Sequence, residues 1–391
     1  MHRLTRRNFL ACVAGAALSG ALGACGNSVA GTSPAAGSSA NGGGAPGSAG
    51  WQAAWDSTIA AGKQEGTVSV IAAAGDWPRP FYDAFQKKYG INVNLLQVNG
   101  QAELTPRVDN ERKSGLYAWD VAVQPSQNLF NGLKKINALA PLRPALILPD
   151  VLDDSHWLKG FDDGWSDTGK SLVYSFVSEL TWGVRVNRAI VPESQLSRFD
   201  QLWDPKWKGK MAWQDPSLLL SGIGPAGAIY KFKGEDQLRF MLKDQQPGIT
   251  QDQRQLAEWL IRGQYPISIG LNGTTLAIYQ RQGLDIKNIQ ILKDDNPAAA
   301  QRSAGGGGLS LFSRAPHPNA AQVLINWLLT QDAGALFAAA TLANSRRLDV
   351  PAADPDGVLD PKRETLDTTS EADYTSVILK AQAVARDVLQ K

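Results

Sequence analysis

Strands and helices alternate along this chain, and that alternation limits the fold more than any other feature. The β-branched run 67–71 is typical of a buried strand and lies between Gly66 and Gly75. Apolar residues then recur at every fourth position, as on one face of a helix: Phe81, Phe85 and Tyr89. Residues 91–95 alternate like a second strand. This βαβ order predicts an α/β sheet with functional loops at its strand ends.

The same order extends further along the chain. We expect Asp76 to be the N-cap of the first of these helices and Gly90 to end it. A charged helix over 103–114 leads into a strand at 120–123. Near the far end, apolar residues spaced as on one helix face predict another amphipathic helix: Ala321, Leu324, Ile325 and Leu328.

The first residues look like an export signal. The paired Arg6 and Arg7 resemble a twin-arginine signal, and the uncharged apolar run 9–22 follows them. That run has 14 residues, fewer than the roughly 20 that a membrane-spanning helix needs. It closes on a Leu-Gly-Ala-Cys sequence that resembles a bacterial lipobox ending at Cys25. The resemblance implies cleavage after residue 24 and lipid on Cys25, which would anchor the protein in a membrane.

A linker follows the predicted lipid site. Residues 26–50 carry no charge and consist almost entirely of Gly, Ser, Ala, Asn, Thr and Pro. Such a stretch buries little apolar surface, and as a coil it reaches roughly 25–30 Å. We therefore expect residues 1–24 to be the signal, and 25–50 to be a lipidated cysteine with a flexible tether.

Charge and composition exclude several functions. Removal of the signal with its three arginines leaves 36 basic against 37 acidic residues, so no basic face for nucleic acid is expected. Cys12 lies in the signal and Cys25 would carry lipid, so no thiol remains in the body for a disulfide or a metal. His156 and His317 are the two histidines of that body. We expect no metal site built on histidines and no cofactor.

No enzyme motif is present in the sequence. It contains neither a Gly-x-Ser-x-Gly elbow nor a His-Glu-x-x-His zinc motif. The glycine run 305–308 leads into the strand-like 309–312, whereas a phosphate loop would lead through Gly-Lys-Ser/Thr into a helix. We expect a binding protein rather than an enzyme.

Three segments resemble one family. The run 199–210, which contains Asp-Pro-Lys-Trp-Lys-Gly, and the Asp215-Pro216 pair after it resemble bacterial extracellular solute-binding proteins. The closest group in that resemblance contains the ferric-ion, thiamine and aminoethylphosphonate receptors. Residues 315–321 and the opening βαβ unit resemble the same family. The resemblance implies a type II periplasmic-binding fold, α/β, with two lobes joined by crossover strands near 180–186 and 308–312.

The resemblance also implies a division into domains and a function. Lobe 1 would comprise 51–180 and 309–350, and lobe 2 would comprise 181–308 and 351–391, with a last helix near 371–389 returning to lobe 2. The protein would capture a small solute between the lobes and deliver it to an ABC permease. Two other classes stay open: a lipoprotein that senses a ligand for a signalling partner, and a lipid-anchored hydrolase.

Candidate ligand contacts follow from loop positions at predicted strand ends. Each also has a structural reading as a cap, a packing residue or a salt bridge. The candidates are Gly75, Asp76, Trp77, Gln124, Ser126, Trp182, Asp215, Ser217, Ser221, Asn272, Gly273, Thr274, Thr275 and Arg347, with Arg346 as the alternative to its neighbour.

A ferric-ion receptor of the same fold is a further alternative. Receptors of that kind place adjacent tyrosines after a strand of the second lobe, where this chain has 270–276 without a tyrosine. Residues 72–76 also lack the histidine of their first strand. This loop rich in hydroxyl and amide groups favours an organic solute or an oxyanion over iron.

Overall fold

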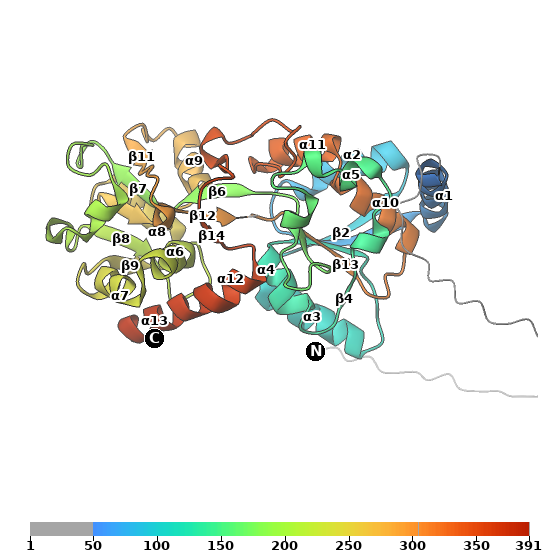
Figure 1. Ribbon diagram of the computed structural model, residues 1–391, viewed down its shortest axis with the longest axis horizontal. Coiled ribbons are helices and arrows are strands. Elements are labelled where there is room, and N and C mark those ends of the chain that lie inside the picture. The colour runs from blue at the N-terminus through green and yellow to red at the C-terminus, as the bar shows by residue number, and fades with distance from the viewer. Residues whose placement is uncertain (1–49, 304, 391) are drawn as a thin grey trace, which may run out of the picture. The chain divides into compact units, whose positions relative to one another are not determined.

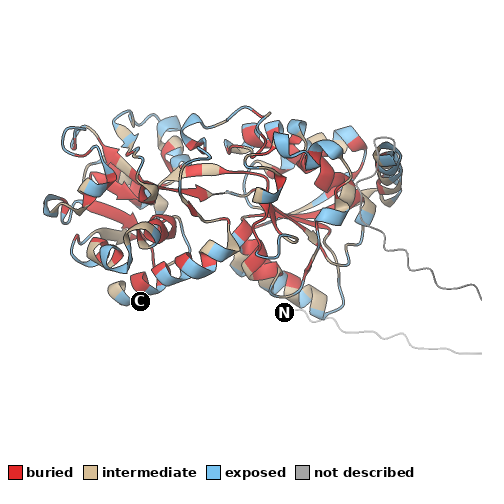
Figure 2. Ribbon diagram, in the orientation of Figure 1, coloured by how far each residue is buried: buried red, intermediate tan, exposed pale blue. Residues whose placement is uncertain are grey.

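Two open sheets and the helices that cover them make up most of the part of the chain that the computed structural model describes, residues 50–303 and 305–390 (Figure 1). The expectations for Arg6, Arg7 and Cys25 lie outside the described residues. Buried residues concentrate in the strands and on the inner faces of the helices (Figure 2).

The first sheet has six strands in the order β2-β1-β3-β13-β4, with β5 also paired to β13. β1 runs parallel to β2 and β3, and β13 runs antiparallel to β3. The strands are β1 Thr67–Ala73, β2 Asn92–Val98, β3 Val121–Gln124, β4 Leu139–Ala140, β5 Tyr174–Ser175 and β13 Gly308–Phe312.

The helices of this region are α1 Gly50–Glu65, α2 Pro78–Tyr89, α3 Gln101–Lys113, α4 Ser126–Asn128, α5 Pro149–Leu152, α10 Pro318–Leu328 and α11 Gln331–Thr341. The apolar stripe of α2 packs on α10, where the rings of Phe81 and Trp327 lie 4.9 Å apart. Gly90 ends α2 in the left-handed conformation, φ 69°, as predicted. The predicted N-cap was wrong: Trp77 occupies that position and no side chain caps the helix. Pro78 and Pro80 lie in the first turn, so two N–H groups are absent there, which lowers the need for a cap.

The second sheet has five strands in the order β11-β7-β10-β8-β9. They are β7 Val184–Asn187, β8 Met211–Gln214, β9 Gly248–Thr250, β10 Ile267–Ile269 and β11 Ile289–Ile291. β10 and β9 run parallel to β8, whereas β7 runs antiparallel to β10. Four helices accompany this sheet: α6 Ile223–Lys233, α7 Glu235–Lys243, α8 Gln253–Ile261 and α9 Gly273–Arg281.

Two strands carry the chain between the sheets. β6 Glu179–Trp182 leads from β5 to β7, and β12 Ala300–Ser303 leads from β11 toward β13. They pair with each other antiparallel, and the short β14 Leu366–Asp367 pairs with β12. The predicted crossover near 180–186 is confirmed for 180–182, which lie in β6, whereas 184–186 lie in β7 of the second sheet. The one at 308–312 was wrong, because β13 pairs with β3, β4 and β5 in the first sheet.

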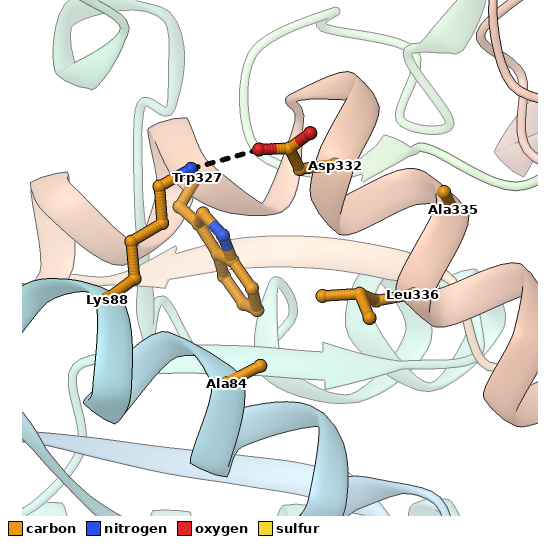
Figure 3. Close-up of a pocket in the computed structure, with 6 residues that line it drawn as sticks. All are labelled: Ala84, Lys88, Trp327, Asp332, Ala335 and Leu336. Carbon is orange, nitrogen blue, oxygen red and sulfur yellow. Dashed lines mark hydrogen bonds and ion pairs between the residues drawn. The ribbon is translucent and has the colours of Figure 1, made fainter.

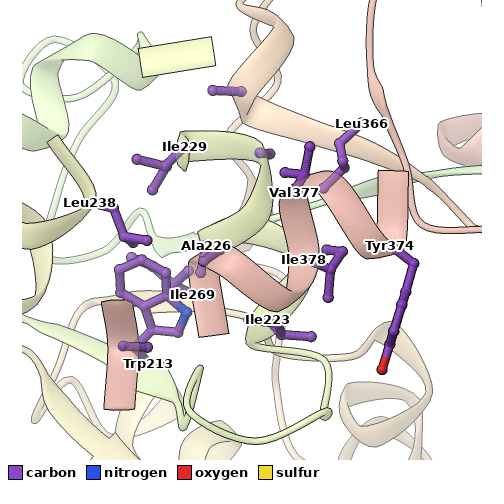
Figure 4. Packing of buried hydrophobic residues seen from close by; sticks show 14 of the residues in the cluster. Trp213, Ile223, Ala226, Ile229, Leu238, Ile269, Leu366, Tyr374, Val377 and Ile378 are labelled. Atoms are coloured by element: carbon purple, nitrogen blue, oxygen red, sulfur yellow. The ribbon is translucent and has the colours of Figure 1, made fainter. Parts of the chain in front are cut away.

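The C-terminal segment begins with α12 Glu371–Asp373, passes through one π-helical turn over Tyr374–Ile378 and continues as α13 Leu379–Leu389. α13 packs on α6 and α7, as the predicted return to the second lobe requires. Figure 4 shows Ile378 and Val377 beside Ala226 of α6 in this apolar core.

Among the described residues no single helix is long and apolar enough to cross a membrane. α10 and α11 are long and apolar enough only when they are taken together, and a bend of 74° separates them.

Candidate functional site

The candidate site lies at the carboxyl ends of the parallel strands. Residues 74–77 follow β1 and residues 125–126 follow β3. In the second sheet, 215–222 follow β8 and 270–273 follow β10. Loops at such ends are where open α/β sheets bind ligands, because helix N-termini and free backbone groups gather there.

The loop after β1 keeps two candidates exposed, Gly75 and Asp76. Asp76 is exposed, and no hydrogen bond to its carboxylate is seen among the described residues. The backbone N–H of Gly75 donates to Gln97 Oε1 at 3.0 Å. Trp77 is half-buried with its ring 4.9 Å from that of Phe337, so most of its surface serves packing.

The two candidates at the end of β3 are turned inward: Gln124 is the last residue of the strand and Ser126 follows it. Gln124 and Ser126 are buried. The Ser126 hydroxyl lies 2.6 Å from that of Ser175. β13 lies close against both residues, since a Cβ on Gly308 would meet the backbone O of Gln124 at 2.5 Å and Ser126 Oγ at 2.8 Å. This placement favours a structural role for both residues.

Asp215 and Ser217, after β8, form a closed turn. The Asp215 carboxylate accepts from the backbone N–H of Ser217 at 3.0 Å and from its hydroxyl at 2.6 Å. Both residues are buried. Ser221, further along the same loop, is half-buried, and no hydrogen bond from its hydroxyl is seen among the described residues.

Hydrogen bonds to Gln253 fix the backbone of the loop after β10, and part of the loop is exposed. Gln253 of α8 clamps it, since Nε2 donates to Gly270 O at 2.8 Å and Oε1 accepts from the Asn272 N–H at 2.9 Å. Asn272 is the N-cap of α9 but makes no side-chain cap. Gly273 and Thr274 are exposed, whereas Thr275 is buried. No hydrogen bond from the side chains of Asn272 and Thr274 is seen among the described residues, so both can meet a ligand.

Trp182 and Arg347 have internal partners. The Trp182 indole N–H donates to Asp356 O at 2.8 Å. The Arg347 guanidinium is buried and pairs with Asp150 at 3.0 Å and Asp349 at 2.6 Å. Its neighbour Arg346 is also buried. A ligand contact by Arg347 is not supported by this placement, because its donors are already used within the protein.

Sequence reasoning missed Arg185, which lies in β7. Its Nε donates to Leu271 O at 3.2 Å, which brings the guanidinium to the loop after β10. Burial lowers its pKa, against the opposing effect of Asp354 and Asp356. A signal existed: a charged residue between two valines of a short strand is unusual unless it has a specific partner.

Figure 3 shows a pocket of about 440 Å³ in another place, between α2 and the α10–α11 pair. Trp327, Leu336 and Ala84 line it, and a 3.1 Å ion pair between Lys88 and Asp332 spans it. Its lining includes none of the predicted site residues, and it lies at the C-terminal half of α2. It is therefore separate from the loops at the strand ends. Within the described residues no cluster of three or more His, Cys, Asp or Glu could hold a metal ion.

Comparison with known proteins decides the family. The family model for bacterial extracellular solute-binding proteins matches residues 81–354. The chain belongs to this family. Its members are binding proteins, and the chain is a binding protein rather than an enzyme. No curated protein matches the sequence.

Solved structures share the two-lobed periplasmic-binding fold. The Trichodesmium protein FutA (IdiA), solved with iron and citrate, is 17% identical with a TM-score of 0.64, covering 83% of this chain and 100% of its own. Iron-bound HitA from Pseudomonas aeruginosa is 19% identical with a TM-score of 0.60, covering 82% and 99%. A putative extracellular solute-binding protein from Bordetella parapertussis is 13% identical with a TM-score of 0.62, covering 84% and 98%. Identities this low show a common fold and leave the ligand open.

Proposed function

We propose that this protein is an extracytoplasmic receptor that captures a small organic solute or oxyanion between its two lobes and hands it to an ABC permease. Membership of the solute-binding family is the observation that carries the proposal. The open loop after β10, with Asn272, Gly273 and Thr274, supports it as the second-lobe wall of the site. Asp76 in the loop after β1 is the best-placed candidate from the first lobe.

Anchoring belongs to the same proposal. A lipid on Cys25 would hold the receptor at the membrane, and the uncharged linker that ends at residue 50 would let the folded part move roughly 25–30 Å from it. Export through the twin-arginine route would follow from Arg6 and Arg7. Such an arrangement keeps the receptor close to a membrane-embedded permease.

Native mass spectrometry of freshly purified protein tests the receptor function and identifies the solute. Receptors that enclose their solute release it slowly, so we expect a bound mass that mild unfolding releases. A thermal-shift screen of organic anions, phosphonates, polyamines and vitamins complements it, because a ligand that binds only the folded state raises the melting temperature. Hydrolytic turnover of a screened ester or phosphate would contradict the receptor assignment.

Ferric iron is the second candidate, since FutA and HitA were both solved with iron. The loop after β10 carries Thr274 and Thr275 without a tyrosine, and Tyr279, two turns into α9, donates to Glu258 at 3.1 Å. We predict no visible charge-transfer band when ferric citrate is added to metal-free protein, because no phenolate is placed at this loop. A saturable coloured complex with one iron per chain would favour iron and overturn our assignment of residues 270–276.

A further inference from the structure

An arginine without an acidic partner lies beneath the open loop of the second sheet. No ion pair to Arg185 is seen among the described residues, and its one side-chain hydrogen bond goes to the carbonyl of Leu271. The carboxylates that act on it are those of Asp354 and Asp356. Asp356 is paired with Lys293 at 2.6 Å, and Asp354 accepts from the backbone N–H of Asp356 at 3.0 Å. Asp356 is therefore paired with Lys293, and among the described residues neither acid lies within ion-pair distance of Arg185.

The guanidinium meets the positive end of a helix. A Cβ on Gly273, the first residue of α9, would lie only 3.1 Å from Arg185 Nη2. No side chain caps α9, and its first turn holds no acidic residue. The N-terminus of a helix carries a partial positive charge and free N–H groups. Two positive groups thus face each other, and in the described part of the chain no acidic side chain forms an ion pair with Arg185.

A buried hydroxyl provides an independent observation. Ser268 of β10 is the cross-strand neighbour of Arg185 in β7. It is fully buried, and its Oγ has no hydrogen-bond partner in the described part of the chain. Cross-strand neighbours place their side chains on the same face of a sheet. An unused polar group therefore adjoins the unpaired cation, although buried polar groups nearly always have partners.

We propose that Arg185, Ser268 and the first turn of α9 bind the oxyanion of the solute, either a carboxylate or a phosphonate. The inference rests on the proposed receptor function and specifies its ligand class. An oxyanion accepts from the guanidinium and from the backbone N–H groups of Gly273 and Thr274 together, in charge-assisted hydrogen bonds. The exposed side of the loop gives the anion its approach.

The first test needs no knowledge of the solute. Thr274→Asp places a carboxylate at the N-terminus of α9 beside Arg185, and Thr274→Asn is the uncharged control of similar shape. Thr274 is exposed, so both variants should fold. Without ligand we expect the Asp variant to melt about 1–3 °C above the Asn variant, because the acid offsets both positive groups. Equal melting temperatures would overturn the inference.

The second test measures binding of metal-free citrate and inorganic phosphate by calorimetry. Of the two probes, we consider the one that binds wild type more tightly. Arg185→Gln should weaken its binding about 10- to 100-fold, since hydrogen bonds to charged groups are among the stronger ones. Arg281→Gln is the matched control: it removes the same charge from the exposed far end of α9 and should leave binding unchanged. Thr274→Asp should weaken binding as Arg185→Gln does, which covers the case that the Arg185→Gln variant folds poorly. The preferred probe separates carboxylate from phosphonate chemistry.

Failure of this inference is distinguishable from failure of the receptor function. A polyamine or neutral solute that binds and compacts the wild type, with the Arg185→Gln variant binding equally well, would overturn the oxyanion site and leave the receptor intact. Binding of citrate or phosphate that both arginine variants weaken equally would also overturn it, because general charge would then be the cause.

Discussion

At the scale of single residues, burial separates the candidates that remain available from those that the protein uses itself. Ser126, Ser217 and Arg347 are all buried and hydrogen-bonded within the chain. Asp76 and Thr274 are exposed. The sequence places polar residues after strands but does not say which way they face, because Ser and Asp at strand ends often bond to their own loop. The packing of distant segments decides which way each side chain faces, and the packing of β13 against Gln124 is one example.

One half-buried acid makes the stability depend on pH. Glu179 of β6 lies where the chain crosses between the sheets, and burial raises the pKa of its carboxyl to about 7, with a smaller contribution from Asp354. The folded state therefore holds this proton more tightly than the unfolded state, whose pKa is about 4.3. The resulting stabilisation is complete below pH ~4 and is lost as pH rises to about 7.

We predict that Glu179→Gln removes this loss. In urea unfolding, the free energy of unfolding of the variant minus that of wild type should be roughly 1–3 kcal/mol larger at pH 8 than at pH 5. The reason is that an amide stays neutral where the carboxylate must ionise. Glu193→Gln, at an exposed position, is the control and should show almost no such gain. Equal free energies of unfolding for Glu179→Gln and wild type at both pH values would contradict this prediction and show that the Glu179 carboxylate is well solvated.

At the scale of elements, local patterns predicted much of the fold. The strand 120–123 and the helix around 321–328 were both expected from β-branched runs or apolar spacing, which need no long-range information. The crossover at 308–312 failed because composition does not reveal which sheet receives a strand. β12, at 300–303, was missed as a crossover because its buried polar residues Gln301 and Arg302 do not resemble a core strand.

The site was less predictable than the elements. The loop after β10 was found because a clear strand ends there, and its open face agrees with the expectation. A charge between two valines indicates that Arg185 has a specific partner, but the sequence does not say which one, because its place beside Gly273 arises when β7 pairs with β10. Cross-strand neighbours such as Arg185 and Ser268 are more than 80 residues apart in sequence, so no local pattern reveals their contact.

Close packing between α6 and the C-terminal segment gives a prediction at this scale. A Cβ on Gly227 would meet the end of Ile378 at 2.6 Å and of Leu366 at 2.9 Å, and both contacts are with flexible side-chain tips. Gly227→Ala should be close to neutral, since helix propensity offsets the contact. Gly227→Val should cost about 1–3 kcal/mol in urea unfolding, because the larger side chain overpacks the core. A Val variant as stable as the Ala variant would contradict this packing.

At the scale of the whole molecule, several contacts link the segments of the two sheets. β6 and β12 cross between them as a pair. Glu371, at the start of the C-terminal segment, binds Lys134 at 2.5 Å and the Thr168 N–H at 2.8 Å, while α13 packs on α6 and α7. Strand crossovers and a bridging segment of this kind allow hinge motion between lobes without separating them.

Membrane anchoring is tested on the full-length chain. We predict that Cys25→Ser removes lipid attachment, so that the exported protein no longer fractionates with membranes. The physical reason is that Cys25 is the proposed site of the lipid and the apolar run before it has only 14 residues, too few to span a bilayer. Thr32→Ser in the linker is the control. A Cys25→Ser protein that stays membrane-bound after signal removal would contradict the lipobox assignment.

The central claim is that a solute binds between two lobes and closes them, and small-angle scattering with and without ligand tests it most directly. The solute identified by mass spectrometry is added to ligand-free protein at 100-fold its dissociation constant, where linkage supplies about 2.7 kcal/mol of stabilisation. We predict a smaller radius of gyration together with a higher melting temperature, because ligand binds the closed form better. Saturable binding that raises the melting temperature but leaves the radius of gyration unchanged would contradict the account.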